Sequence, residues 1–125
     1  MSARVLQLRL PLPPNLANHL KGMHWATWHR KRKAYYLRAL VTERALRGRP
    51  QPFREARVEI DLYLPQRMDR DNAMARCKWA IDCLVRAGLV VDDREPYCVL
   101  AGLPGQHVAE PHGVAITLTE IAPDA

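Results

Sequence analysis

The segment Met68-Asp69-Arg70-Asp71-Asn72 carries the most informative residues of this 125-residue chain. Asp69 and Asp71 are separated by one residue and follow an alternating apolar stretch that is typical of a strand. Two carboxylates at a strand end can converge on a hard divalent cation, which prefers oxygen ligands. The alternative is that Asp71 or Asn72 simply caps the next helix, because both are common N-cap residues.

A second carboxylate pair, Asp92-Asp93, lies farther along the chain. A helix from Asn72 to Arg86 would extend roughly 22 Å, and an extended stretch from Gly88 to Asp93 can return about 17 Å. If that stretch runs antiparallel to the helix, three or four carboxylates gather at one end of the sheet. Carboxylates crowded in this way favour a neutralising cation. A solvated acidic turn is the alternative interpretation of Asp92 and Asp93.

Lys78 is a candidate to assist at this site. It lies seven residues after Asp71, two helical turns away, so both side chains are expected on one helix face, which Asp82 continues. A lysine beside a metal–carboxylate cluster can stabilise a phosphorane-like transition state or orient the attacking water. A surface ion pair between Lys78 and Asp82, which would contribute little to stability, is the equal alternative.

Positive charge is concentrated in one part of the sequence. Between His19 and Arg49 there are nine lysine or arginine residues and a single acidic residue, Glu43. A charge run is usually a solvated helix face, but this imbalance is too one-sided for internal salt bridges and favours contact with a polyanion. The expected phosphate-binding residues are Arg30, Lys31, Arg32, Lys33 and Arg38.

The overall charge supports the same partner. The formal net charge is +6 and the pI is about 9.7, which favours nucleic acid before an anionic membrane. No apolar run approaches the roughly 20 residues that cross a bilayer, so no membrane partner is expected. Trp25 and Trp28 lie beside the basic run and can stack on unpaired bases, although a place in the core is favoured.

The remaining composition indicates a cytoplasmic protein, which would associate with the nucleoid if its nucleic-acid partner is DNA. The three cysteines, Cys77, Cys83 and Cys98, lack zinc-ligand spacing and are expected to be reduced, partly buried thiols. Arg9 and two prolines interrupt the apolar N-terminal stretch, so no signal peptide is expected. No glycine loop or nucleophile motif is present, and no small-molecule cofactor is expected.

These residues are expected on alternating strands and helices. Period-two patterns predict strands at 6–12, 56–64 and 114–119 and a short strand around 97–100, while 15–22 and 104–113 are expected to be loops. Helical spacing predicts a long helix over 25–47, closed by Gly48, and a second over 72–86. Their expected buried stripes are Ala34, Leu37, Val41 and Ala45 in the first helix and Met74, Cys77, Ile81 and Leu84 in the second.

The expected fold class is therefore α+β. We expect a single small domain over residues 1–125, in which two helices pack against a mixed β-sheet of about four strands, in the order β-α-β-α-β-β.

Taken in this order, the chain resembles the RusA-like Holliday junction resolvases, small proteins common in phages and prophages. The resemblance covers nearly the whole chain. It rests on a Leu-Pro-Leu-Pro-Pro-Asn opening, a basic His-Trp region, an alternating strand, the motif Asp69-Arg70-Asp71-Asn72, and then Lys78, Asp82, Gly88 and Asp92-Asp93. Lys78 lies farther from the motif's asparagine than the family's best-known spacing, which changes its expected height above the carboxylates.

The resemblance implies a homodimeric, magnesium-dependent endonuclease that cuts branched DNA. Asp69, Asp71 and Asp93, with Asp92 beside them, would hold Mg²⁺, for which Mn²⁺ can substitute, and Lys78 would assist catalysis. Two such sites across a two-fold axis suit paired nicks in a four-way junction.

Three alternatives stay open at this stage. The chain could be a binding module that grips branched DNA or RNA without cutting it, or a nuclease that prefers flaps or single strands. In the third alternative it is a structural or partner-binding protein, and Asp69, Asp71 and Asp93 are merely caps and turns.

Overall fold

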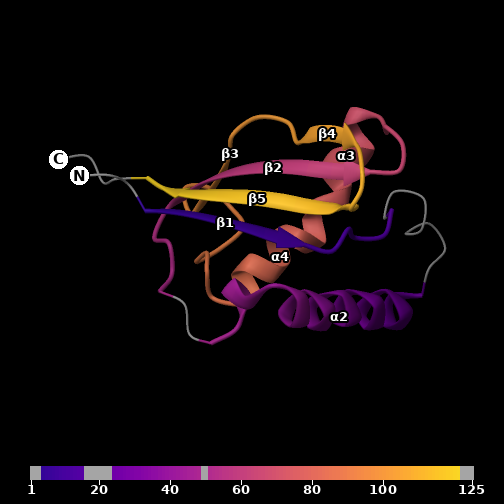
Figure 1. The fold of residues 1–125 in the computed structure, drawn as a ribbon. Coiled ribbons are helices and arrows are strands. Elements are labelled where there is room, and N and C mark those ends of the chain that lie inside the picture. The colour runs from indigo at the N-terminus through magenta and orange to yellow at the C-terminus, as the bar shows by residue number, and fades with distance from the viewer. Residues whose placement is uncertain (1–3, 16–23, 49–50, 122–125) are drawn as a thin grey trace.

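The computed structural model describes residues 4–15, 24–48 and 51–121. Its strands are β1 (Val5–Leu10), β2 (Ala56–Leu64), β3 (Cys98–Leu100), β4 (Gly105–Val108) and β5 (Gly113–Glu120). Its helices are α2 (Trp25–Thr42), α3 (Arg70–Arg76) and α4 (Lys78–Arg86), with a 3-10 turn, η1 (Arg44–Leu46). The predicted α+β domain with a mixed sheet and packed helices is confirmed (Figure 1). Apart from Asn15, the loop predicted at 15–22 lies outside the described residues.

The sheet is centred on β2. The strand order is β1-β5-β2-β3, and β4 also pairs with β2. β1 and β5 run antiparallel to each other, as do β5 and β2, whereas β3 and β4 run parallel to β2. β3 pairs with the beginning of β2 and β4 with its end, so the two short strands share one edge. The loop predicted at 104–113 is therefore wrong in its first part, which forms β4.

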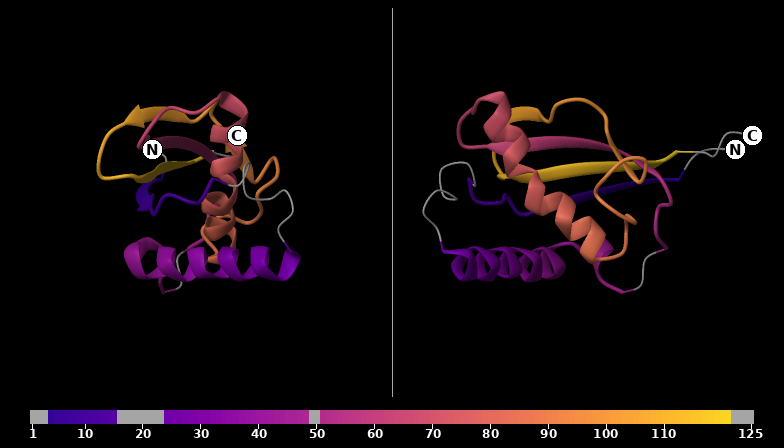
Figure 2. Two further views of the ribbon diagram at one scale, coloured as in Figure 1. Left: turned by 90° about the vertical axis from the view of Figure 1, so that its right-hand side faces the viewer. Right: turned by 180° about the vertical axis from the view of Figure 1, so that it is seen from behind.

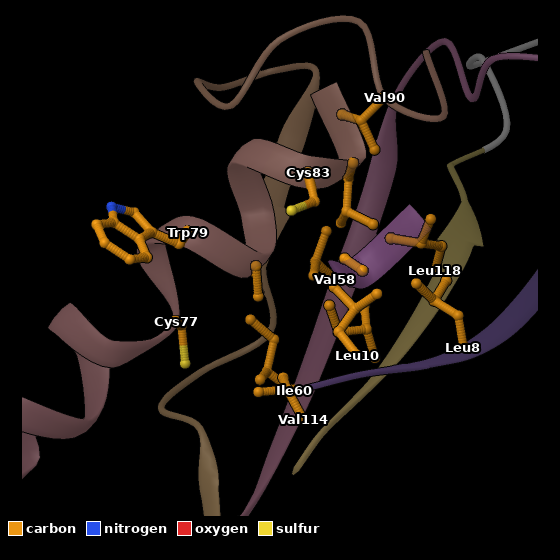
Figure 3. Packing of buried hydrophobic residues seen from close by; sticks show 14 of the residues in the cluster. Leu8, Leu10, Val58, Ile60, Cys77, Trp79, Cys83, Val90, Val114 and Leu118 are labelled. Carbon is orange, nitrogen blue, oxygen red and sulfur yellow. The ribbon is translucent and has the colours of Figure 1, made fainter. Parts of the chain in front are cut away.

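Alternation along β2 separates the two faces of the sheet. Ala56, Val58, Ile60, Leu62 and Leu64 are buried, whereas the intervening side chains are exposed or half-buried. α3 and α4 cover the buried face, and α2 crosses beyond the β1 edge against α4, so the described helices leave the other face uncovered (Figure 2). The core is an aliphatic layer between β1, β2, β5 and α4 (Figure 3). Full burial of each such side chain contributes roughly 1.5–3 kcal/mol.

The first helix differs from the prediction in phase and length. Leu37 and Val41 are 51% and 73% exposed and Ala34 is also exposed, so the predicted buried stripe is wrong for these three residues. Ala45, the fourth, lies in η1 and is half-buried against the core. The helix instead buries Tyr35 and Ala39, and the Tyr35 hydroxyl donates to the carbonyl of Pro11 at 2.7 Å. Burial raises the pKa of that phenol well above its ordinary range.

α2 ends at Thr42 because Glu43 turns into an extended conformation. One Glu43 oxygen caps η1 by accepting the N–H of Ala45 at 3.1 Å, and the other accepts the Arg9 N–H of the edge strand β1 at 2.7 Å. These two bonds satisfy a free strand edge and a helix end together, which a continuous helix to residue 47 would not achieve.

The second predicted helix forms, but in two segments. α3 begins at Arg70, two residues before the predicted start, and Cys77 separates it from α4, where the Cys77 N–H bonds to Met74 in a tighter i→i−3 turn. Cys77 and Leu84 are buried as expected, and Trp79 joins them in the core. The three cysteines are free and buried, and burial raises the pKa of Cys77 and of Cys83 to about 12.

Candidate functional site

Asp69 and Asp71 lie just beyond the end of β2, where α3 begins (Figure 1). Asp69 is the N-cap: its Oδ1 accepts the backbone N–H of Asn72 and its Oδ2 the Asn72 side-chain amide, both at 2.9 Å. A cap was predicted here as the alternative interpretation, but for Asp71 or Asn72. The Asp71 side chain is 92% exposed, and its nearest cation, Arg70, lies 3.8 Å away. One carboxylate is therefore fixed in place, whereas the other is open to solvent.

Asp92 and Asp93 form a tight pair of their own. The Asp93 N–H donates to Asp92 Oδ1 at 2.7 Å, and Arg94 Nε lies 3.0 Å from Asp92 Oδ2. The hydrogen bond from Asp93 lowers the pKa of Asp92, and the positive charge of Arg94 adds a smaller effect in the same direction. The shared hydrogen bond with Asp92 raises the pKa of Asp93, aided by partial burial and by the negative charges of Asp92 and Asp82. A cation bound to this pair would reduce the repulsion between its two carboxylates.

A single chain does not bring the two pairs together. Val90 forms an isolated β-bridge with Phe53, which precedes β2, and Cys98, the first residue of β3, pairs with Ala56, the first residue of β2. The segment between them, which carries Asp92 and Asp93, therefore lies beside the start of β2. Asp69 and Asp71 follow its end, at the opposite end of the strand (Figures 1 and 2). Within residues 4–15, 24–48 and 51–121, no group of three or more His, Cys, Asp or Glu side chains is close enough to share a metal ion. The stretch after α4 returns only part of the way along the helix.

Lys78 and Asp82 do not form the ion pair considered as an alternative. Asp82 instead forms a salt bridge with Arg32 of α2, whose Nη2 lies 2.9 Å from Asp82 Oδ2, and both side chains are at least two-thirds buried. Lys78 is exposed. Arg32 also lies over the Trp28 ring, 5.5 Å from its centroid. The interruption at Cys77 lies between Asp71 and Lys78, so these residues are on different helical segments.

The basic helix presents most of its expected phosphate-binding residues to solvent. Arg30, Lys31, Lys33 and Arg38 are exposed, whereas Arg32 joins α2 to α4. Trp28 packs edge-on against Trp79 with ring centroids 5.9 Å apart, as expected of a core residue, but Trp25 is 69% exposed. The basic segment of α2 and the start of α3 lie toward the same end of the strands but at opposite edges of the sheet, because α2 lies beyond β1 and α3 lies beside β4 (Figures 1 and 2).

Sequence reasoning missed a polar cluster on the uncovered face of the sheet. His107 Nε2 and Asp61 Oδ1 lie 2.8 Å apart, and the His107 ring stacks on Tyr63 with centroids 4.8 Å apart. Arg9 lies over the same Tyr63 ring, 4.5 Å from its centroid, and donates to the carbonyl of Pro111. Register explains the pairing, since Asp61 and Tyr63 face Gly105 and His107 of β4. No sequence signal revealed it, because β4 itself was not predicted.

A second overlooked feature is a hollow of about 290 Å³ at the start of α3, lined by Arg70, which lies between Asp69 and Asp71 in the sequence. It lies between the connection after β2, the first turn of α3 and the start of β4, and its wall includes Arg67, Arg70 and Gln106. The Gln106 amide holds the connection in place, accepting the Met68 N–H at 2.9 Å and donating to the Met68 carbonyl at 3.0 Å. Arg67 precedes the motif Asp69-Arg70-Asp71-Asn72 and Arg70 lies within it, and neither arginine was given a role from the sequence.

Comparison with known proteins leaves the chain without an assigned family. No protein-family model matches the sequence, and no curated protein is significantly similar to it. Among the helices of the described residues, none is long and apolar enough to cross a membrane.

Proposed function

We propose that this protein is a metal-dependent, structure-specific DNA endonuclease that resolves four-way junctions by paired phosphodiester hydrolysis. The observation that carries the proposal is the exposed pair Asp69 and Asp71 at the end of the central strand, toward the same end of the strands as the basic segment of α2. Carboxylates that can hold a divalent cation and a cationic surface that can bind backbone phosphates are the two parts that support such hydrolysis.

The donor chemistry of the pair fits Mg²⁺. This ion is held by one or two carboxylates together with water and substrate phosphate oxygens, so it does not need an all-protein cage. Asp71 is open to solvent, and each Asp69 oxygen retains a lone pair beyond its bond to Asn72. When bound, Mg²⁺, or Mn²⁺ in its place, would lower the pKa of a water molecule and offset charge on the leaving oxygen.

The chain's own residues would position the DNA. Arg30, Lys31, Lys33 and Arg38 would contact backbone phosphates through the exposed face of α2. Asn72 would hold the Asp69 carboxylate in one orientation through its two hydrogen bonds. Lys78, which is exposed at the start of α4, would contribute positive charge near the cleaved strand.

A homodimer would reconcile the two carboxylate pairs. Because α3 and α4 together span roughly 25 Å, Asp92 and Asp93 can join the Asp69–Asp71 pair only if they come from a second copy. Mixing two inactive variants tests this arrangement. An Asp71→Asn chain and an Asp93→Asn chain would then form mixed dimers with one intact composite site, and the mixture would nick DNA although neither variant does alone. If the two variants exchange subunits but their mixture stays inactive, the Asp69–Asp71 pair and the Asp92–Asp93 pair do not form one composite site.

The first experiment is cleavage of a labelled four-way junction with Mg²⁺, beside duplex, flap and single-stranded controls. We expect symmetric nicks on the junction alone, and Asp71→Asn should abolish them while junction binding persists. Cleavage confined to flaps or single strands would keep the metal chemistry but replace the junction as substrate. Retained cleavage by Asp71→Asn would remove Asp71 from the site.

The basic surface has a matched internal control. Arg30→Glu with Lys33→Glu should weaken junction binding and reduce the slope of its salt dependence, since phosphate contacts release counterions. Arg57→Glu, on the uncovered face of the sheet and paired with Glu59, should change neither. Equal effects of both variants would move the DNA surface away from α2.

A binding module without catalysis is the second candidate, because the four aspartates are not gathered in one chain. In that case the exposed Trp25 would stack on an unpaired base beside the cations of α2. Junction binding without any cut in Mg²⁺ or Mn²⁺ would favour this candidate.

A further inference from the structure

The hollow at the start of α3 combines the two kinds of wall that a nucleotide needs. Arg67 and Arg70 line one part of it, while Ala73, Leu103 and Pro104 supply apolar surface. Leu103 is 61% exposed, although leucine is ordinarily among the more buried residue types. A ligand that is anionic at one end and apolar in its body matches this lining better than an inorganic ion would.

The arginines are available for an anionic ligand. Arg70 makes only the 3.8 Å contact with Asp71, and both side chains there are largely exposed. In the described part of the chain, Arg67 forms no ion pair with a carboxylate. Guanidinium groups bind phosphate oxygens with parallel N–H donors, so two arginines in one wall are suited to one phosphate group.

Part of the wall of the hollow is held in place by hydrogen bonds within the chain. The two hydrogen bonds between Gln106 and the Met68 backbone join β4 to the connection that carries Arg67. A preformed wall lowers the ordering cost of binding. The volume of about 290 Å³ lies at the lower limit of ordinary ligand pockets, roughly 300–1,000 Å³, and suits one nucleotide unit.

We propose that this hollow binds one nucleotide of the DNA strand next to the scissile phosphate, with Arg67 and Arg70 on its phosphate and Leu103 against its sugar. The proposal rests on the proposed function for its substrate, since Arg70 lies between the two candidate metal ligands in the sequence. Its role is positioning: the hollow sets which phosphodiester faces Asp69 and Asp71.

The first test uses thymidine 3′,5′-bisphosphate as the probe, in EDTA, and follows backbone amide resonances of the full chain by NMR. We expect saturable shifts at Gly105, Gln106 and Ala73, which disappear in the Arg67→Gln/Arg70→Gln double variant. Arg57→Gln, whose arginine is paired with Glu59 away from the hollow, is the control and should keep them. Shifts confined to α2, or equal shifts in the double variant, would overturn the proposal.

The second test separates a DNA strand from a free nucleotide. Junction binding is measured in EDTA over a range of salt concentrations, and the double variant should lower the slope of log K against log salt by about 1 for each phosphate that the protein no longer neutralises. If the double variant keeps the wild-type slope although the wild-type chain binds the probe at the hollow, the assignment to DNA is overturned in favour of a free nucleotide. If the wild-type chain binds the probe and the junction but cuts nothing, the proposed endonuclease activity fails while the nucleotide site stands. If the wild-type chain cuts the junction but the double variant alters neither the probe-induced shifts nor the salt dependence of binding, the nucleotide site fails while the endonuclease activity stands.

Discussion

Substitution of Asp69 separates two roles that its carboxylate would combine. As the N-cap of α3 it accepts two hydrogen bonds from Asn72 at 2.9 Å. Asp69→Ala removes both bonds and should lower the free energy of unfolding by about 1 kcal/mol, which corresponds to roughly 4 °C in Tm for a chain of this size. Asp69→Asn keeps the oxygen that caps the Asn72 N–H but loses the charge and the second acceptor, which binds the exposed Asn72 amide, so it should cost less than the alanine variant, about 0.5 kcal/mol.

Activity should follow the charge rather than the cap. If Asp69 is a metal ligand, Asp69→Asn and Asp69→Ala lose junction cleavage alike, although only the alanine variant is clearly destabilised. Asp71→Asn is the matched control, since its side chain is 92% exposed and its stability should stay within about 0.5 kcal/mol of the wild type. Its cleavage should be abolished as well.

The assays are urea unfolding followed by circular dichroism and nicking of a labelled junction in Mg²⁺, on the same preparations. An Asp69→Asn variant that cuts like the wild type would reduce Asp69 to a helix cap and refute its place in the site. An Asp69→Ala variant as stable as the wild type would refute the capping geometry itself.

Two further predictions concern the fold. Gly105→Ala should displace the Asp61 carboxylate, because the new Cβ would lie 2.3 Å from its Oδ1; the His107 imidazole resonances should shift by NMR, while stability changes by less than about 1 kcal/mol because the pair is half-exposed. Unshifted resonances would contradict the pairing. The buried thiols Cys77 and Cys83, with pKa raised from 9.0 to about 12, bind protons more tightly when folded, so their contribution is complete below pH 9 and declines between pH 9 and 12. Relative to a Cys77→Ala/Cys83→Ala variant, the wild type should lose roughly 1.4 kcal/mol per thiol for each pH unit in that window, and parallel urea-unfolding curves across it would refute the burial.

The strands with strong alternation were predictable because pattern and burial agree along their whole length. The bounds of β2 match the predicted range of 56–64, and Pro65 follows it directly. β4 could not be predicted in the same way, because Gly105–Val108 carries little alternation and is a strand through its pairing with the end of β2. Pairing between distant segments is a tertiary effect that a local pattern does not encode.

Helix phase was the weaker part of the prediction. Ala34, Leu37 and Val41 have helical spacing, but so do the residues that actually contact the core, Trp28, Tyr35 and Ala39. Two apolar stripes on one helix give the same period, and only tertiary packing decides between them. Tyr35 packs near Trp79 and bonds to Pro11, two interactions that the sequence does not reveal.

The candidate site was predictable in its residue types and not in its assembly. Spacing identified the motif Asp69-Arg70-Asp71-Asn72, and the structure places it at a strand end as expected. The convergence of Asp93 on it depended on a chain direction after α4 that sequence could not set. The arginines of the hollow went unnoticed because their significance depends on β4, the strand that the pattern missed.

The position of Asp92 and Asp93 decides whether the proposed active site is built from one chain or from two. Most other features considered for activity lie toward one end of the strands: the Asp69–Asp71 pair, the hollow with Arg67 and Arg70, and the basic segment of α2. Under the proposed function, the carboxylates of that end would bind the metal ion and its cations would bind DNA phosphates. A second chain that brings Asp93 to it would make a fuller site, with one site at each side of a two-fold axis. If no second chain does so, Asp92 and Asp93 are a solvated turn, and any cleavage depends on Asp69 and Asp71 alone.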